Sequence, residues 1–383
     1  MMELIFWIFV FVFLYTYAGY PLLLLLLKRT ASVRVSAEKD LPTVTVLIAA
    51  YNEAALISKK IENTFALSFP VELLNIVVVA DGSADATPEI VRSFSNVTLL
   101  FEAERKGKSA AINRALNYIH SEIVVMTDAN CFLASGTLEA MIPCFNDASV
   151  GAVAGSKKVV ATEEGMTDGE GIYWKYESSL KQMESDFFSV IGAAGELVAF
   201  RRACYTEIPA AAITDDFYLS LSINLQGKRV VYAPKATGKE SASLSLKDEW
   251  NRKVRIAAGG IQSLFYFSRA LNPFLYPRLA FQFISHRFFR WVLAAPALAF
   301  IFLSNVWLTV AGAGVMYAIF LVLQLAFYLC ALLGYALSGR AHAYKFLQLP
   351  FYFVMMHAAQ PVGAIRYFTG KQTSVWKKAQ RAD

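Results

Sequence analysis

The sequence is poor in charge for its length. Only 17% of its 383 residues are Asp, Glu, Lys or Arg, whereas 56% are hydrophobic. Water-soluble domains carry about a quarter charged residues, so part of this apolar content requires a non-aqueous environment. The apolar excess lies at the two ends of the chain, and the stretch from Lys28 to Arg278 has an ordinary globular composition. We therefore expect a membrane protein with one substantial water-soluble domain.

Three further features are missing from the sequence. The four cysteines form no C-x-x-C pair and have no histidine at metal-ligand spacing, so we expect reduced, mostly buried thiols. The net charge is +6, but no basic stripe with interleaved aromatic residues accompanies it, so nucleic acid is not an expected partner. The first apolar run lacks a basic leading segment and a small-residue cleavage site, which argues against a cleaved signal peptide.

Apolar runs of membrane-spanning length lie near both ends of the chain. A spanning helix needs about 20 residues, and Leu4–Leu27, Trp291–Val310 and Val315–Leu337 each meet that length. Basic residues, beginning with Lys28 and Arg29, follow the first run. Under the positive-inside rule they place the next domain in the cytosol.

Two other C-terminal stretches are more polar. Phe346–Phe368 carries His357 and Arg366, which favours a re-entrant or interfacial helix. Phe274–Arg290 mixes aromatic residues with Arg and His, which suits a helix lying in the interface. The expected order is an N-terminal transmembrane helix (1–28), a cytosolic domain (29–260), interfacial helices (261–290) and C-terminal membrane segments with a basic tail (291–383).

Strands and helices alternate in the central domain. Short apolar runs rich in β-branched residues predict strands, and the stretches between them predict helices. The expected strands are Thr43–Ala49, Ile76–Ala80, Val97–Phe101 and Glu122–Met126, and the expected helices include Glu53–Phe65 and Ser109–Ile119. Apolar strands that alternate with helices predict an α/β fold with a mostly parallel sheet flanked by helices.

Polar residues follow three of these strands, in the segments 51–53, 81–83 and 128–130. Ligands of such sheets bind at the carboxyl ends of the strands. A carboxylate at the end of a buried strand is costly unless a positive or hydrogen-bonding group meets it. Two such acids, Asp81 and Asp128, beside the amide oxygen of Asn130 therefore predict a divalent cation such as Mg²⁺. A lone acid such as Asp85 is as readily explained as a turn or helix cap.

Five motifs carry a resemblance to a known family. They are A-A-Y-N-E (49–53), A-D-G-S-x-D-x-T (80–87), G-K-x4-N (107–113), T-D-A-N (127–130) and T-D-D-x-x-L (214–219). In this order they closely resemble the family 2 glycosyltransferases, whose catalytic domain has the nucleotide-sugar-binding GT-A fold. The resemblance covers about residues 43–260, and the flanking apolar runs resemble the membrane-bound polysaccharide-synthase branch.

The resemblance implies roles in binding a nucleotide-sugar donor. Tyr51 would stack on the nucleoside, Glu53 would accept hydrogen bonds from it, and Asp81 would also read it. Lys108 would contact phosphate or sugar oxygens as a point charge. Packing and capping at the start of a helix is the alternative for Tyr51 and Glu53, and a solvated helix start is the alternative for Lys108.

The resemblance also implies the catalytic groups. Asp128 and Asn130 stand at the family's D-x-D metal site, which would hold Mg²⁺ or Mn²⁺. Asp216 stands at the general base, which would deprotonate the acceptor hydroxyl and contribute about 10²–10⁴ in rate. The alternative for Asp216 is a favourable interaction with a helix dipole.

Two motifs depart from the family pattern. Asn130 replaces a carboxylate, so either the metal affinity is lower or the second ligand comes from elsewhere. The Q-x-x-R-W signature reads R-K-V-R-I at 252–256. Arg252 and Arg255 can still clamp a diphosphate, but Ile256 cannot stack on an acceptor sugar as Trp does, which argues against long processive synthesis.

The expected function is that of an inverting glycosyltransferase. It would move a sugar from a nucleotide-sugar, by resemblance a UDP-sugar, to a saccharide acceptor in exopolysaccharide or cell-surface glycan synthesis. Single transfer to a polyprenyl phosphate or another membrane lipid is the alternative, and a non-catalytic transporter is a third that leaves the motifs unexplained. The expected partners are the donor, a glycan or lipid acceptor and membrane lipids, and no export partner is identified. The expected location is a bacterial inner membrane.

Overall fold

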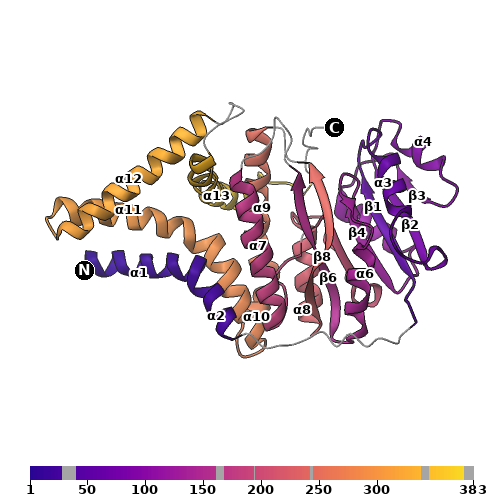
Figure 1. The fold of residues 1–383 in the computed structure, drawn as a ribbon, viewed down its shortest axis with the longest axis horizontal. Helices are drawn as coiled ribbons and strands as arrows, with labels where there is room; N and C mark the ends of the chain where they lie inside the picture. The colour runs from indigo at the N-terminus through magenta and orange to yellow at the C-terminus, as the bar shows by residue number, and fades with distance from the viewer. Residues whose placement is uncertain (28–39, 161–167, 194, 242–244, 338–344, 375–383) are drawn as a thin grey trace. The chain divides into compact units, whose positions relative to one another are not determined.

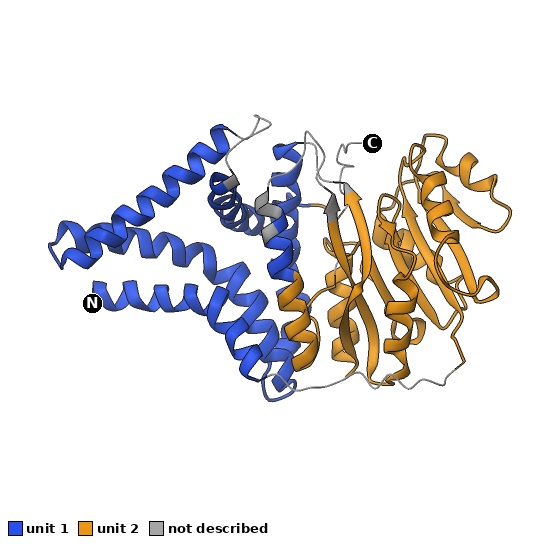
Figure 2. Cartoon of the chain, viewed as in Figure 1, with its two compact units in different colours: residues 1–27, 161–177, 243–372 blue, residues 28–160, 178–242, 373–383 orange. Residues whose placement is uncertain are grey.

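The computed structural model describes residues 1–27, 40–160, 168–193, 195–241, 245–337 and 345–374 (Figure 1). The basic residues after the first apolar run and the basic tail lie outside these ranges. The chain forms two compact units (Figure 2). We call them the sheet unit (residues 28–160, 178–242 and 373–383) and the helical unit (residues 1–27, 161–177 and 243–372).

The sheet unit is built on one sheet with the strand order β3-β2-β1-β4-β7-β6-β8-β5. The strands are β1 (Val44–Ala50), β2 (Leu74–Asp81), β3 (Thr98–Glu102), β4 (Ile123–Asp128), β5 (Phe132–Leu133), β6 (Val150–Val160), β7 (Leu197–Arg201) and β8 (Arg229–Ser241). Strands β3, β2, β1 and β4 are parallel, as the sequence predicts. The sheet as a whole is mixed, because β7 runs antiparallel to both β4 and β6, and β5 runs antiparallel to β8.

Helices cover both faces of the sheet. On one face lie α3 (Ile57–Phe65), α4 (Thr87–Arg92) and α6 (Thr137–Met141), and on the other lie α5 (Lys108–Leu116) and α8 (Asp215–Leu225). A hydrophobic core lies on each face of the sheet, and alternate residues of β1 contribute to the two cores. Val46 and Ile48 pack in the core on the α3 side, and Leu47 packs in the core on the α5 side. Because the side chains of a strand alternate between faces, a strand buried on both faces is mostly apolar. In β1 the one polar side chain, that of Thr45, forms a hydrogen bond with Ser121. Short 3₁₀ helices complete the unit at Val71–Leu73, Ile142–Asn146 and Arg202–Cys204.

The helical unit contains the apolar helices. They are α1 (Met2–Leu14), the π-helical η1 (Tyr15–Gly19), α2 (Tyr20–Leu26), α9 (Leu246–Tyr266), the 3₁₀ helix η5 (Ser268–Leu271), α10 (Pro277–Gln282), the π-helical η6 (Phe283–Leu293), α11 (Ala294–Val310), α12 (Val315–Ala336) and α13 (Lys345–Phe368). Helix α7 (Asp168–Phe187) begins in this unit and ends in the sheet unit. Within the described ranges, three helical stretches are long and apolar enough to cross a membrane: Met2–Leu26, Pro277–Val310 and Val315–Ala336.

The expected interfacial stretch Phe274–Arg290 leads into a long helix. Pro277–Val310 is one continuous helical stretch of 34 residues, and an interfacial position of its first part stays a prediction. Its polar residues His286 and Arg290 are buried inside the helical unit, where Arg290 pairs with Glu177. Residue 260, the expected domain boundary, lies inside α9, and α9 belongs to the helical unit.

Helix α13 is not among the three apolar stretches of spanning length. It contains Pro350 and Pro361 and packs against α9 and α12. Gly363 makes this packing close, since a Cβ there would lie 2.7 Å from the carbonyl oxygen of Val254.

Candidate active site at the strand ends

The sheet brings the carboxyl ends of β1, β2 and β4 to one edge. Ala50 pairs with Ala80 of β2, and Ala49 pairs with Asp128 of β4, so the polar residues that follow these strands start at the same level. This edge is where parallel α/β sheets bind ligands.

Lys108, the first residue of α5, lies between two carboxylates. Its Nζ is 2.7 Å from Asp128 Oδ1 and 3.5 Å from Asp215 Oδ2. The three side chains are only 14–25% exposed. Burial alone would lower the pKa of Lys108, but the charges of Asp128 and Asp215 outweigh it and raise the pKa above its usual value. Lys108 is therefore a fixed positive charge at the strand ends.

Asp216 lies next to this group, in the first turn of α8. Its Oδ1 accepts a hydrogen bond from the backbone N–H of Phe217, and its side chain packs against Gly195, where a Cβ would lie 3.2 Å from Asp216 Cβ. Burial, followed by the charges of Asp215 and Glu196, raises the pKa of Asp216 to about 6. A carboxylate with such a pKa is suited to accept a proton near neutral pH.

Asp81 holds the loop that leads into α5. The buried carboxylate accepts hydrogen bonds from the backbone N–H groups of Lys106, at 3.1 Å, and of Gly107, at 2.6 Å. Because Gly107 directly precedes Lys108, this contact helps to place the lysine. The role of Asp81 in reading a nucleoside stays a prediction.

The segment after β1 forms a tight turn. Asn52 has a φ of 54°, and its side-chain oxygen accepts a hydrogen bond from the backbone N–H of Ala84. Asp85 accepts hydrogen bonds from the backbone N–H groups of Ala54 and Thr87, so it holds the turn together and fits its interpretation as a turn residue.

Tyr51 and Glu53 lie in this turn. Tyr51 contacts Arg105, a residue that is not among the predicted site residues. The guanidinium of Arg105 lies over the ring of Tyr51, with 3.6 Å between its carbon and the ring centroid. The backbone N–H of Glu53 donates to Thr87 Oγ1. Sequence reasoning misses Arg105 because its only signal is a place in the basic run before Lys108.

Asn130 lies at the edge of a second charged group. Its Nδ2 donates a hydrogen bond of 3.2 Å to Glu240 Oε1. Lys157 of β6 forms ion pairs with Glu240 of β8 and with Glu196, and its side chain is only 3% exposed. No motif marks these three residues, because the sheet joins them from segments far apart in the sequence.

Lys60 supports the loop that follows β4. It is fully buried in α3 and donates hydrogen bonds to Thr127 Oγ1 and to the carbonyl oxygen of Cys131. Burial lowers the pKa of Lys60 to about 8.

The four cysteines are free thiols, and Cys131 and Cys204 are buried.

The sequence profile described as "Glycosyltransferase like family 2" matches residues 42–293, well over half of the chain. The chain belongs to this family. The resemblance carried by the five motifs is thereby confirmed.

Two curated relatives place this family 2 glycosyltransferase near polysaccharide and glycolipid synthases. The Poly-beta-1,6-N-acetyl-D-glucosamine synthase of Staphylococcus aureus (strain COL) is 26% identical over 250 residues, which are 61% of this chain and 60% of the relative. The Beta-monoglucosyldiacylglycerol synthase of Trichormus variabilis is 27% identical over 243 residues, which are 58% of this chain and 50% of the relative. The chain thus matches no more than 60% of the length of either relative.

A solved structure shares the fold. A mannosyltransferase from Pyrobaculum calidifontis, in complex with GDP-Man and Mn²⁺, has a TM-score of 0.74 at 24% identity. The match covers 97% of this chain and 100% of that chain. The likeness confirms the predicted GT-A-like α/β fold with apolar helices at both ends.

The family's divalent cation fits the residues at the strand ends. Mg²⁺ commonly binds one or two carboxylates and completes its shell with water and substrate phosphates. Within the described ranges, no three Asp, Glu, His or Cys side chains are gathered closely enough to hold a metal alone. Asp128 and Asp215 do share one cationic partner, and the buried Asp215 Oδ2 makes no hydrogen bond. Two carboxylates and the donor's phosphates together form a suitable ligand set.

Arg252 and Arg255 lie on α9, in the helical unit. Arg252 pairs with the buried Glu249 at 2.8 Å. The pKa of Glu249 falls to about 2, because Lys253 and Arg252 outweigh the effect of burial. A role for the two arginines at the donor diphosphate stays a prediction.

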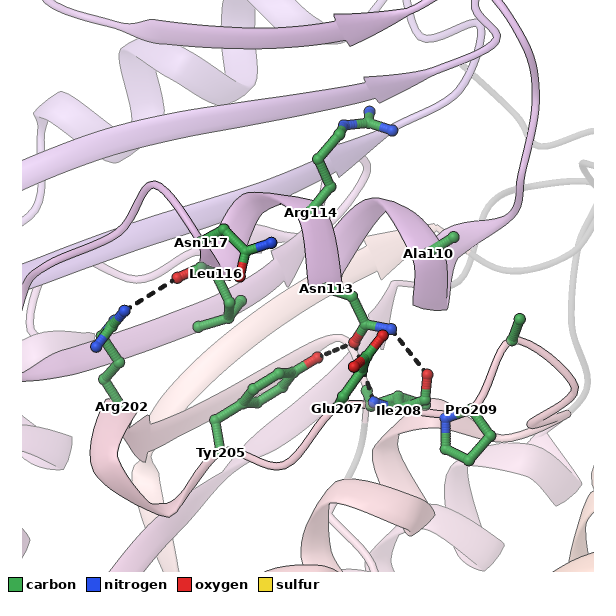
Figure 3. A pocket seen from close by; sticks show the side chains of 11 residues that line it. Ala110, Asn113, Arg114, Leu116, Asn117, Arg202, Tyr205, Glu207, Ile208 and Pro209 are labelled. Carbon is green, nitrogen blue, oxygen red and sulfur yellow. Dashed lines mark hydrogen bonds between the residues drawn. The ribbon is translucent and has the colours of Figure 1, made fainter.

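A cavity of about 680 Å³ lies between α5 and the segment that follows β7 (Figure 3). None of the predicted site residues lines it. At its centre, Asn113 of α5 accepts hydrogen bonds from the hydroxyl of Tyr205 and the backbone N–H of Ile208 and donates one to the carbonyl oxygen of Ile208 (Figure 3). Asn113 thus ties α5 to the loop that leads to Asp215.

Proposed function

We propose that this family 2 glycosyltransferase is a metal-dependent, inverting enzyme of the membrane. It transfers a sugar from a nucleotide-sugar, a UDP-sugar, to a saccharide acceptor in exopolysaccharide or cell-surface glycan synthesis. The observation that carries this proposal is the grouping of Lys108, Asp128, Asp215 and Asp216 at the carboxyl edge of the sheet. Such a group offers a base for an acceptor and positive charge for a leaving diphosphate.

The proposed mechanism is a single displacement. Asp216 takes the proton of the acceptor hydroxyl, and the resulting oxygen nucleophile attacks the anomeric carbon from the side opposite the nucleotide, which inverts that centre. Lys108 contacts the donor's phosphate oxygens and offsets part of the charge that develops on them. Mg²⁺ or Mn²⁺, when bound at Asp128, supplies Lewis-acid stabilisation of the leaving diphosphate.

Transfer to a membrane lipid is the second candidate. The Trp of the Q-x-x-R-W signature is replaced by Ile256, which lies on α9 and is 38% exposed. A branched aliphatic side chain cannot offer a sugar the flat contact of an indole ring. The relationship to a diacylglycerol-glycosylating synthase points in the same direction.

Three apolar stretches of spanning length support a membrane protein. We place the sheet unit in the cytosol, where nucleotide-sugars are made, and the helices in a bacterial inner membrane. The partners are then the donor, a glycan or lipid acceptor and membrane lipids.

The test is nucleotide release by the purified full-length protein in detergent with native lipid extract. A panel of UDP- and GDP-sugars is assayed with Mg²⁺, with Mn²⁺ and with EDTA. Metal-dependent release is expected, which disappears in Asp128→Ala and falls by about 10²–10⁴ in Asp216→Asn. Wild-type rates in Asp128→Ala would reject the metal site, and silence with every donor would favour a transporter. Mass analysis of the product then separates a polymer from a singly glycosylated lipid.

A further inference from the structure

The structure explains why the second position of the D-x-D motif is an amide in this chain. Asn130 donates its side-chain N–H to Glu240, which is itself paired with Lys157. A carboxylate at position 130 would face Glu240 as a like charge, which is unfavourable in a buried site. The amide therefore belongs to the neighbouring Lys157–Glu240 group, and the cation site has one negative ligand fewer than the family pattern.

Asp215 lies where the missing charge is needed. Its Oδ2 is buried and makes no hydrogen bond, which is costly for a carboxylate oxygen. The nearest cation is Lys108, 3.5 Å away, and the same ammonium lies 2.7 Å from Asp128 Oδ1. The two carboxylates thus already converge on one positive charge.

We propose that Asp215 supplies the second carboxylate of the divalent-cation site in place of position 130. This inference rests on the proposed function, because it concerns the cation that Asp128 is proposed to hold. The Lys108 ammonium offsets part of the charge of the two carboxylates before the cation and the donor bind, and it contacts the donor's phosphates once they are bound. Asp216 is not the second ligand. It accepts a hydrogen bond from the N–H of Phe217, and direct coordination would lower its basicity.

The experiment is a Mn²⁺ titration of the full-length protein in detergent with saturating UDP. Free Mn²⁺ is followed by electron paramagnetic resonance, and a protein-free UDP blank is subtracted. Asp128→Asn and Asp215→Asn are each expected to raise the Kd for Mn²⁺ at least tenfold. Asn130→Ala is expected to change it less than threefold. Asp216→Asn is the matched control, since it removes the same charge one residue away, and it too is expected to stay within threefold.

A softer ligand separates coordination from a general effect of charge. Thiolate ligands favour soft cations over Mn²⁺. Asp215→Cys is therefore expected to bind Cd²⁺ at least tenfold more tightly than Mn²⁺, whereas Asp216→Cys shows no such change in preference. If Asp215→Asn folds poorly, this comparison of the two cysteine variants still tests whether residue 215 coordinates the cation.

The outcomes distinguish the inference from the proposed function. If Asp128→Asn loses Mn²⁺ but Asp215→Asn binds it as well as Asp216→Asn does, the assignment of Asp215 is wrong and the proposed function stands. If the wild-type protein binds no Mn²⁺ with UDP, or Asp128→Asn binds it normally, the proposed metal dependence itself is wrong.

Discussion

The charges around Asp216 set its protonation at the scale of single residues. Its pKa is raised to about 6, first by burial and then by Asp215 and Glu196. A general base acts only when it is deprotonated, so kcat/KM for nucleotide release, which reports the free enzyme, should be constant above pH 7. It should fall about tenfold per pH unit below pH 6, because each unit leaves about a tenth of the active form. The measurement is kcat/KM between pH 5 and 8 at limiting donor and metal.

The control for this pH profile is Asp216→Asn. Its residual rate should be lower by about 10²–10⁴, the usual contribution of a general base. It should also show no acid limb near pH 6, because the titrating group has been removed. A wild-type kcat/KM that is unchanged from pH 7 to pH 5 would contradict the assignment of Asp216 as the base.

Gly82 occupies a position where both the backbone conformation and the nearby Arg105 favour glycine. It follows β2 with a φ of +69°, and a Cβ there would lie 2.5 Å from Arg105 Cβ and 2.8 Å from Arg105 Cα. Gly227 has a similar φ of +77°, but a Cβ on this residue would meet nothing within 4 Å. Gly227→Ala should cost about 1 kcal/mol through backbone strain, and Gly82→Ala should cost clearly more because backbone atoms must also move. Thermal unfolding of the two variants in one detergent compares them, and equal losses would contradict the steric argument.

Which site residues could be predicted from the sequence depends on how the fold brings them together. Asp81 and Asp128 end strands β2 and β4, so their place at one edge of the sheet follows from the two apolar runs. Glu240 and Lys157 come from β8 and β6, whose pairing the sequence does not reveal. Arg105 could not be assigned either, because its contact with Tyr51 depends on the conformation of the loop held by Asp81.

At the scale of elements, α5 joins the two halves of the candidate site. Its first residue, Lys108, contacts Asp128 and Asp215, and further along the helix Asn113 holds the loop that leads to Asp215. Asn113→Ala should lower kcat by about 10²-fold, the effect of a misplacement near 1 Å. Thermal unfolding should change less than activity, because the helix keeps its core contacts.

Asn117→Ala is the matched control for this prediction. Asn117 lies on the same cavity, but the structure shows no hydrogen bond of its side chain within the described residues. Its kcat should stay within about twofold of the wild type, as for most surface substitutions. Steady-state kinetics of both variants give the two kcat values. Equal losses of kcat would mean that the cavity, and not the hydrogen bonds of Asn113, affects activity.

The elements themselves are predictable to different degrees. Strands β1, β2 and β4 match their apolar runs within two residues at either end, because strands buried on both faces are mostly apolar. The antiparallel direction of β7 has no local signal, since it depends on which partners the strand finds. Phe274–Arg290 stands apart in the sequence because it mixes aromatic residues with Arg and His. The ion pair of Arg290 with Glu177 has no signal in the sequence, since the two residues lie more than a hundred positions apart.

At the scale of the whole molecule, the helical unit must accommodate ionic groups among apolar helices. Arg290 and Glu177 form an ion pair with 7% and 5% of their side chains exposed, and the rings of Tyr17 and Tyr176 lie 5.6 and 5.7 Å from the guanidinium carbon. Removing Glu177 leaves the buried Arg290 charge without this acid, and removing Arg290 leaves the buried Glu177 beside His286, whose Nε2 lies 3.9 Å from its Oε2. Arg290→Met and Glu177→Gln should therefore each reduce the free energy of unfolding by about 3–5 kcal/mol.

The double variant decides whether the ion pair or the packing is responsible. If the loss comes from an unpaired charge, Glu177→Gln combined with Arg290→Met should cost much less than the sum of the single changes, because no charge is left buried. The exposed pair Glu89–Arg92 is the control, with side chains 68% and 54% exposed, and Arg92→Met should cost no more than about 1 kcal/mol. Denaturant unfolding in detergent measures all four variants. If the losses in free energy of unfolding add up in the double variant, each side chain stabilises the unit through its own packing contacts. The unpaired charge would then carry no extra cost.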